Sequence, residues 1–254
     1  MKNFININSK INEFNKVINI SSDKSISIRC ILLASQAIGV SKIYNILESD
    51  DVMNAFNAIK KLGIDYKRKK NHYKIYGLGI NGYHTNKKLS INAGNSGTLA
   101  RLILGLLINC KNGITLFGDK SLSKRDFSRV TNPLRLFGAN IESNNKKLPV
   151  KISGSEFLRP ISYFEKLGSA QCKSAVMLAA LKCPGITRIK AVKSRNHTEL
   201  LFRNLKIPIK VFKKKRFDLI EVNGLKNFKG FEYVVPGDIS SCSFFLVLTL
   251  LSEK

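Results

Sequence analysis

The sequence predicts a mixed α/β fold built from one folding unit that is used three times and begins a fourth time. Three similar tripeptides each precede a β-rich segment at steps of 74 and 72 residues, namely Gly39-Val40-Ser41, Gly113-Ile114-Thr115 and Gly185-Ile186-Thr187. A second set closes a helix in each copy, namely Leu62-Gly63-Ile64, Phe137-Gly138-Ala139 and Leu205-Lys206-Ile207. A fixed period indicates a supersecondary unit used repeatedly, so we expect three pseudo-threefold repeats of helix, strand, helix and hairpin.

The first copy shows this order most simply. Ser27–Gln36 has the apolar spacing of a helix, Ser41–Ile46 is rich in β-formers, and Asp50–Leu62 is helical again. Ile64–Tyr66 and Tyr73–Tyr76 then resemble the two arms of a hairpin. Helices and sheets that alternate in this way form layers, with the helices covering the sheets.

The second and third copies repeat the same order. The second is predicted as helix Thr98–Ile108, strand Ile114–Phe117, helix Arg129–Phe137 and strands Ala139–Glu142 and Pro149–Ile152. The third is predicted as helix Ala170–Leu181, strand Ile186–Val192, helix His197–Leu205 and strands Ile209–Phe212 and Asp218–Val222. The fold class therefore depends on a pattern seen three times rather than on any single element.

The fourth copy contributes only its beginning. Pro236-Gly237-Asp238-Ile239-Ser240-Ser241 leads into an apolar helix, Cys242–Leu251. Terminal repeats normally carry a polar outer face, and an exposed apolar helix favours association. We therefore expect this helix to pack on elements that the 254 residues do not supply.

The charge of the chain has two interpretations. Lys and Arg total 43 against 17 Asp and Glu, a formal net charge of +26, which suggests anionic partners. The same residues crowd featureless stretches such as Met1–Asn15, and the tracts Lys67–Lys70 and Lys213–Arg216 fall at expected hairpin turns. This distribution favours a general compositional bias over a nucleic-acid surface.

The cysteine, histidine and hydropathy patterns argue against a disulfide-bonded, a metal-binding and a membrane-spanning protein. The five cysteines are odd in number, lack CxxC spacing and mostly lie in apolar helical runs (Cys30, Cys110, Cys172, Cys183 and Cys242), as is typical of reduced, buried cysteines. The three histidines are scattered, so we predict no metal site. The N-terminus lacks a signal core, and Phe244–Leu251 is too short to cross a bilayer. We expect a cytoplasmic protein without membrane association.

Reactive residue types gather where the first helix of each copy begins. The clusters are Ser22–Arg29, then Asn92–Thr98 with Arg101, and Gly168–Ser174. A helix start offers unpaired N–H groups and partial positive charge, so hydroxyls, glycine and a cation there form an anion cradle. Any one cluster is more simply a set of N-caps. Their recurrence in equivalent positions favours an anion with several charged groups.

Cations at these positions support the same interpretation. A cation inside a helix start opposes the helix dipole by about 0.3–1 kcal/mol, so we expect a bound anion to offset Lys24, Arg29, Arg101 and Lys173. Arg125 and Arg195 precede second helices, where a planar guanidinium can grip a phosphate or carboxylate. Asp50 and Asp51 are interpreted as helix caps, since acids are stabilising at a helix start.

Six ordered motifs resemble those of the enolpyruvyl transferases, in the branch that acts on 3-phosphoshikimate. GDKSISHR is matched by Ser22–Arg29, with Ser22 in place of Gly and Ile28 in place of His, and GNSGTxxRL is matched by Gly94–Leu102. GDxSLxxRPMxRV is matched by Gly118–Val130 with Asp126 in place of Pro, and SAQVKSA by Ser169–Ala175. SRDHTE is matched by Ser194–Glu199 with Asn196 in place of Asp, and PGDISSAAFFL by Pro236–Leu246. The motifs span nearly the whole chain.

The resemblance implies transfer of an enolpyruvyl group from phosphoenolpyruvate to the 5-hydroxyl of 3-phosphoshikimate, with release of phosphate, in aromatic amino-acid synthesis. It implies that 3-phosphoshikimate is bound by Lys24, Ser25, Arg29, Ser169, Ala170 and Gln171, with Ser194 or Arg195. It implies that phosphoenolpyruvate is bound by Lys24, Gly97, Arg125 and Gln171. No metal or organic cofactor is implied, and the full-length protein is expected to be a monomer.

The resemblance also implies a domain plan. Six such repeats form two domains, with the substrates between them. Residues 21–236 are then one complete three-repeat domain, while 1–20 and 237–254 belong to a second domain that is largely missing. The acid–base carboxylates are expected beyond residue 254, so the chain alone should be inactive. Two alternatives stay open: a non-catalytic nucleic-acid-binding module, and a half-length protein completed by a separately encoded partner.

Overall fold

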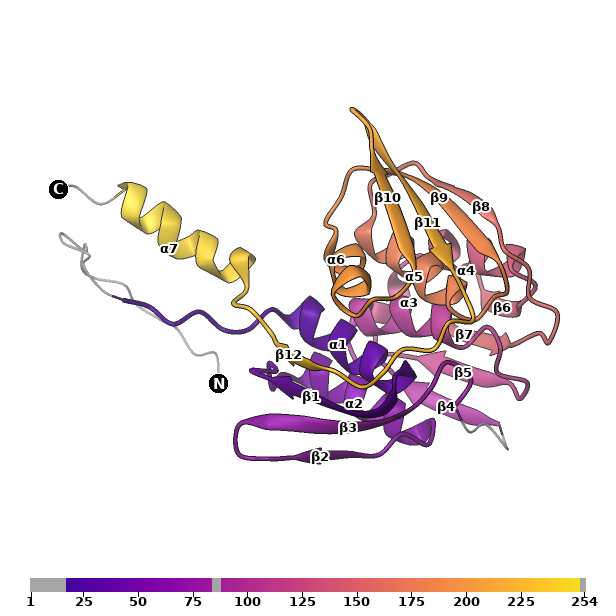
Figure 1. Ribbon diagram of the computed structural model, residues 1–254, viewed down its shortest axis with the longest axis horizontal. Helices are drawn as coiled ribbons and strands as arrows, with labels where there is room; N and C mark the ends of the chain where they lie inside the picture. The colour runs from indigo at the N-terminus through magenta and orange to yellow at the C-terminus, as the bar shows by residue number, and fades with distance from the viewer. Residues whose placement is uncertain (1–16, 84–87, 252–254) are drawn as a thin grey trace.

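Three four-stranded sheets surround a core of helices in the computed structural model, which describes residues 17–83 and 88–251. The sheets lie on the outside and the helices between them (Figure 1). The mixed α/β prediction is thus confirmed. The first repeat comprises α1 (Lys24–Gln36), β1 (Ile38–Tyr44), α2 (Asp50–Lys61), β2 (Tyr66–Arg68) and β3 (His72–Leu78), in the predicted order of helix, strand, helix and hairpin.

The later repeats follow the same order. The second contains β4 (Leu89–Asn92), α3 (Gly97–Leu106), β5 (Ile114–Phe117), the short 3-10 helix η1 (Leu122–Lys124), α4 (Ser128–Leu136), β6 (Asn140–Asn144) and β7 (Lys147–Ser153). The third contains β8 (Ser162–Glu165), α5 (Ala170–Ala180), β9 (Ile186–Val192), α6 (His197–Asn204), β10 (Ile209–Lys213) and β11 (Phe217–Asn223). The chain continues through β12 (Glu232–Val234) to α7 (Ile239–Leu251).

One strand of each sheet was not predicted. The sheet orders are β12-β1-β3-β2, β4-β5-β7-β6 and β8-β9-β11-β10, and the first strand in each order pairs in parallel with the second. These strands have only three or four residues, too few for an alternating pattern to stand out. The first repeat takes its parallel strand from β12, where Lys42 pairs with Glu232 and Tyr44 with Val234. The third repeat therefore connects back to the first.

The first helices of the repeats, α1, α3 and α5, form the centre of the core. Every residue of α3 except Arg101 is buried. A Cβ on Gly105 would lie 2.2 Å from the carbonyl oxygen of Ala175, so only glycine allows α3 and α5 to approach this closely. Equivalent contacts recur where each hairpin passes the end of its helix, since a Cβ on Gly77, Gly154 or Gly224 would overlap backbone atoms of Ala34, Cys110 or Ala180 respectively.

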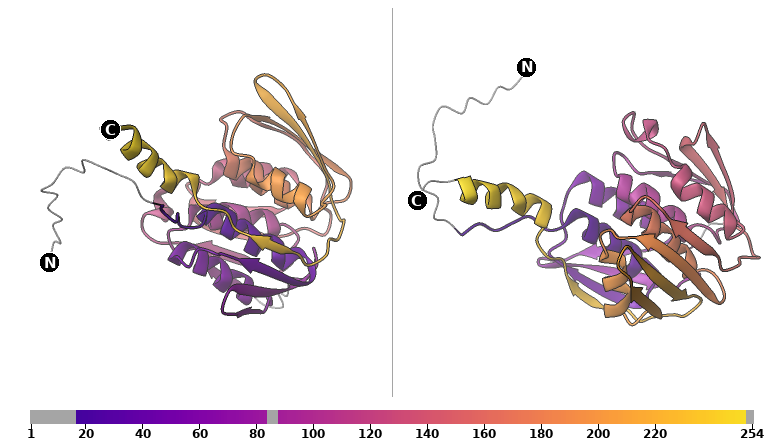
Figure 2. Two further views of the ribbon diagram at one scale, coloured as in Figure 1. Left: turned by 60° about the vertical axis from the view of Figure 1, so that its left-hand side comes forward. Right: turned by 90° about the horizontal axis from the view of Figure 1, so that it is seen from above.

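The last helix differs from the others. None of the described residues of α7 is buried, and α7 projects away from the body of the molecule (Figure 2). Of the five cysteines, all but Cys242 are buried as predicted. Across the described part of the chain, the helices lack the combination of length and apolarity that a membrane crossing requires.

Candidate anion-binding site at the starts of three helices

The three central helices are capped in the same way. In each, the N-cap side chain accepts a hydrogen bond from the backbone N–H three positions on: Asp23 from Ile26 at 2.7 Å, Ser96 from Leu99 at 3.3 Å and Ser169 from Cys172 at 3.2 Å. Each cluster therefore contains an N-cap, as the simpler interpretation of a single cluster expected. For Ser169, the cap occupies the hydroxyl oxygen as an acceptor and leaves its proton free to donate.

Side-chain contacts show that the three helices begin at one end of the core. Arg29, in the second turn of α1, donates to Ser174 Oγ of α5 at 3.2 Å. Gln171, at the start of α5, donates to Thr98 Oγ1 at the start of α3, at 2.9 Å. Both contacts join early turns of different helices, so the three helix starts lie close together. We call this end the front pole and the end where the three helices finish the rear pole.

Residues from two repeats form the first cluster at the front pole. Arg101 Nη1 donates to Gln171 Oε1 at 3.1 Å and to the carbonyl oxygen of Gly97 at 3.1 Å. A Cβ on Gly97 would lie 2.8 Å from Arg101 Nη1 and 3.0 Å from Arg125 Nη1. Gly97, Arg125 and Gln171, all predicted to contact phosphoenolpyruvate, are thus brought together around Arg101. Arg125 is exposed and its Nη2 donates to Asn95 Oδ1 at 3.2 Å.

Positive charge is concentrated in this cluster. Burial lowers the pKa of Arg101, and the neighbouring Arg125 and Arg129 guanidiniums lower it further. The Arg101 guanidinium also lies over the Phe127 ring, 5.1 Å from its centre, which offsets part of that cost. Guanidiniums held this close create a local demand for an anion that a phosphate or carboxylate would meet.

A second cluster connects the first repeat to the third. Arg29 is buried, and it donates to the carbonyl oxygen of Ser25 at 2.9 Å and to Thr198 Oγ1 at 2.9 Å. Burial lowers the pKa of Arg29 to about 10. Ser25 and Arg29 therefore lie together as predicted. Helix α5 joins the two clusters, because it carries Gln171 and Ser174 on successive turns.

Internal carboxylates pair with two of the four cations that were predicted to need a bound anion, Lys24 and Lys173. Lys173 Nζ lies 2.6 Å from Glu199 Oε1, and these side chains are only 1% and 5% exposed. The prediction is wrong for Lys173, because a buried charge must be paired within the fold and Glu199 pairs with it. Lys24 Nζ lies 2.7 Å from Asp51 Oδ2, but the Lys24 side chain is 47% exposed and stays accessible. Asp51 thus binds a cation as well as occupying the first turn of α2.

The loop before α6 holds the remaining predicted ligands. The hydroxyl oxygen of Ser194 is buried and has no hydrogen-bond partner among the described residues. Arg195 is exposed and donates to Ser240 Oγ, at the start of α7, at 3.3 Å. Burial, followed by the charge of Arg29, lowers the pKa of His197. Ala170 is the first residue of α5, directly after the Ser169 cap.

Glu165 was missed as a site residue because the strand that carries it, β8, was missed. Glu165 ends β8 and is buried, and its Oε2 accepts from the backbone N–H of Ser169 at 2.8 Å. Its Oε1 pairs with Arg129 Nη2 at 2.8 Å. Glu165 thereby holds the loop that presents Ser169. Among the described residues, no group of His, Cys, Asp or Glu side chains could hold a metal ion.

Comparisons with known proteins point to one family. Residues 8–254 match the family model described as EPSP synthase (3-phosphoshikimate 1-carboxyvinyltransferase). The chain is 42% identical over 245 residues to the 3-phosphoshikimate 1-carboxyvinyltransferase of Ruthia magnifica, covering 96% of this chain and 55% of the relative. It is 40% identical to that of Lactococcus lactis, covering 92% and 54%. An EPSP synthase structure from Acinetobacter baumannii superposes with a TM-score of 0.80 at 33% identity, covering 91% and 52%. The chain thus spans about half the length of its relatives.

Proposed function

The chain belongs to the EPSP synthase family, and on that premise we propose that it binds 3-phosphoshikimate and phosphoenolpyruvate at the front pole. In the complete enzyme, the enolpyruvyl group would pass from phosphoenolpyruvate to the 5-hydroxyl of 3-phosphoshikimate, and phosphate would leave. The observation that carries this proposal is the convergence of α1, α3 and α5 starts, documented by the Arg29–Ser174 and Gln171–Thr98 contacts. Both substrates carry a phosphate and a carboxylate, which suits more than one anion cradle.

The residues of this chain would act by binding and orientation. Arg125 and Gln171 would hold phosphoenolpyruvate against the first turn of α3, where the absent Cβ of Gly97 leaves room for the guanidiniums of Arg101 and Arg125. Ser25, Arg29, Ser169, Ala170 and Ser194 or Arg195 would hold 3-phosphoshikimate, with Lys24 between the substrates. Fixing two reactants in a common geometry removes much of the entropic part of the barrier.

Proton transfer needs other groups. Six carboxylates near the front pole already have structural roles in the described part of the chain. Three of them bind cations: Asp51 pairs with Lys24, Glu199 with Lys173 and Glu165 with Arg129. The other three accept backbone N–H groups: Asp23 caps α1, Asp126 accepts from Ser128 at 2.6 Å, and Asp238 accepts from Ser240 at 2.9 Å. A general acid or base must reach the proton that it transfers. We therefore propose that the 254-residue chain binds without turnover.

We also propose the domain division 21–236, with 237–254 belonging to a second domain. Strand β12 completes the first sheet at Val234, and the adjacent Val235 is fully buried. Beyond that point the described residues of α7 are not buried. Most of the predicted segment 1–20 lies outside the described residues.

A calorimetric titration with 3-phosphoshikimate tests the proposal. We expect weak, saturable binding that Arg29→Gln and Gln171→Ala reduce and that Arg68→Gln, a remote exposed control, leaves unchanged. A phosphate-release assay with both substrates should stay at background. Absence of saturable binding, or equal loss in the control, would contradict the site. Steep salt dependence of RNA binding, together with indifference to 3-phosphoshikimate, would instead support the nucleic-acid alternative.

A further inference from the structure

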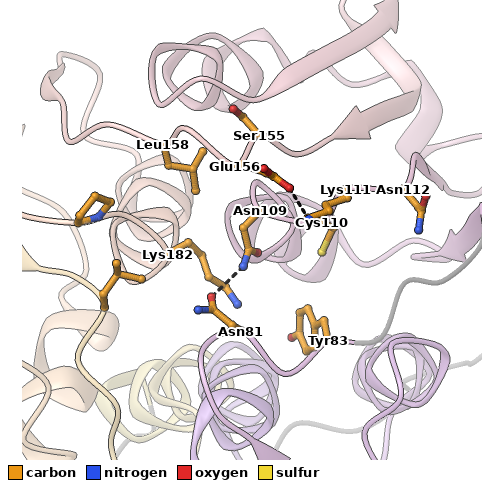
Figure 3. Close-up of a pocket in the computed structure, with 12 residues that line it drawn as sticks. Asn81, Tyr83, Asn109, Cys110, Lys111, Asn112, Ser155, Glu156, Leu158 and Lys182 are labelled. Atoms are coloured by element: carbon orange, nitrogen blue, oxygen red, sulfur yellow. Dashed lines mark hydrogen bonds and ion pairs between the residues drawn. The ribbon is translucent and has the colours of Figure 1, made fainter.

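A pocket lies at the rear pole, on the far side of the core from the predicted substrate site. Its volume is about 530 Å³, within the usual range for small-molecule sites. All three repeats contribute to it, through Tyr83 from the first, Asn109 from the second and Lys182 from the third. Figure 3 shows Lys182 and Asn81 on one side of this pocket and Lys111 and Glu156 on another.

Lys182 gives the pocket its chemistry. The residue is only 3% exposed, and its ammonium donates to Gln36 Oε1 and to the carbonyl oxygen of Ile80. The same ammonium lies 5.0 Å from the centre of the Tyr83 ring. Within residues 17–83 and 88–251, no carboxylate forms an ion pair with Lys182. A buried cation held only by dipoles and a π face lacks the counter-charge that usually accompanies burial.

The other walls combine amide and apolar groups. Asn109 Nδ2 donates to Asn81 Oδ1 at 3.0 Å, while Asn109 Oδ1 is buried and lacks a hydrogen-bond partner among the described residues. Leu158, Pro184 and Leu225 supply apolar surface. Leu225 has φ of +53°, a left-handed conformation that costs free energy for a leucine and places its side chain at the wall.

We propose that the rear pocket binds a small aromatic monocarboxylate, with the carboxylate against Lys182 and the ring between Tyr83 and the apolar wall. One negative charge suits the site, because Lys182 is the single buried cation among the lining residues and Lys111 is already paired with Glu156. A phosphate dianion would face Glu156 without a second free cation. The site is independent of the proposed activity, since it takes no residue from the front pole.

A purely structural role for Lys182 is the competing explanation. The ends of α1, α3 and α5 converge at the rear pole, and their carbonyl groups favour a cation there. The two explanations predict different proton uptake when a carboxylate ligand is added. Burial lowers the pKa of Lys182 to about 7, and a bound carboxylate would raise it again. Burial also raises the pKa of Cys110 to about 11 and raises that of Tyr83, while Lys111 and Glu156 are paired, so these groups do not compete near neutral pH.

Benzoate is the probe. We expect calorimetry at pH 8 to show saturable millimolar binding with uptake of close to one proton, measured from the difference between two buffers of unlike ionisation enthalpy. Lys182→Met should weaken binding by about ten- to a hundredfold, the usual range for a charge-assisted contact. Lys60→Met, an exposed lysine outside this pocket, is the matched control.

Two further measurements guard against a folding defect and a wrong site. Leu158→Asp keeps Lys182 but places a negative charge on the wall, and it should also weaken benzoate binding. 3-Phosphoshikimate binding at the front pole should be unchanged in Lys182→Met, so failure at one pole is distinguishable from failure at the other. Absence of saturable benzoate binding, undiminished binding in Lys182→Met, or displacement of benzoate by inorganic phosphate would overturn the assignment.

Discussion

The front and rear poles are opposite ends of the same three helices, and the buried lysine at each pole is held in a different way. At the front pole the helix dipoles oppose positive charge, and Lys24 and Lys173 each have a carboxylate partner. At the rear pole the dipoles favour positive charge, and the buried Lys182 is held by two oxygen acceptors and a ring. The comparison teaches that Lys173 is buried as half of an ion pair, whereas Lys182 is buried without a carboxylate partner among the described residues and its pKa is lowered by that burial.

Breaking the buried ion pair at the front pole should have the largest effect. Lys173→Met would leave Glu199 buried without its counter-ion, and Glu199 Oε2 already lacks a hydrogen-bond partner among the described residues. We expect the free energy of unfolding, measured by urea denaturation, to fall by about 3–5 kcal/mol.

The double variant with Glu199→Gln is the control for this prediction. Removing both charges should recover part of the loss, because a neutral amide costs less to bury than an unpaired carboxylate. A loss of less than about 1 kcal/mol in Lys173→Met alone would show that the buried Glu199 carboxylate does not depend on Lys173 as its counter-ion.

At the rear pole, the contribution of Lys182 to the free energy of unfolding should depend on pH. Burial lowers the pKa of Lys182 from 10.5 to about 7, so between these values the unfolded chain binds more protons than the folded chain. Stability therefore rises with pH across this window and falls as pH drops toward 7. Between pH 7.5 and 9 we expect Lys182 to raise the free energy of unfolding by about 2 kcal/mol, because each pH unit contributes about 1.36 kcal/mol.

Lys182→Met isolates that contribution. The difference in unfolding free energy between the wild type and this variant should shift by the same amount in favour of the wild type as pH rises. A pH-independent difference would show that Lys182 keeps its ordinary pKa, and that the rear pole stabilises the ammonium fully without an anion.

The sequence predicted the repeats well because each repeat carries its own local signals. Helices α5 and α6 and strand β9 were predicted to within one residue at each end, because capping residues and apolar spacing mark them. Strands β4, β8 and β12 were not predicted. Their stability comes from pairing with strands that lie elsewhere in the chain, and β12 pairs with residues 190 positions earlier. No local sequence pattern therefore predicts them.

The candidate site was predicted in part for a similar reason. The residues at helix starts could be identified, because a hydroxyl, glycine or cation before an apolar helix is a local pattern. Their internal partners could not, since Glu199 meets Lys173, and Glu165 meets Ser169, only after folding. The rear pocket left no sequence signal, because it joins the ends of three repeats.

A smaller perturbation tests the front pole without touching its charges. In Gly97→Ala the new Cβ would lie 2.8 Å from Arg101 Nη1 and 3.0 Å from Arg125 Nη1, both at the ends of flexible side chains. The guanidiniums can move aside, so we expect unfolding free energy to change by less than about 1 kcal/mol. Phosphoenolpyruvate binding should weaken about tenfold, equivalent to about 1.4 kcal/mol. Gly113→Ala, with its nearest atom at 3.4 Å, should change neither quantity.

The smallest effect is expected in α7, which opens the fourth repeat as α5 opens the third. Leu250 of α7 is 83% exposed, whereas Leu178 of α5 is 2% exposed. Leu250→Ser should change the unfolding free energy of the chain by no more than about 0.5 kcal/mol, while Leu178→Ala should cost about 2–5 kcal/mol. A large loss from Leu250→Ser would mean that α7 packs on the three-repeat unit in solution. Helix α7 would then pack together with α1, α3 and α5, and the proposed domain boundary at residue 236 would be wrong.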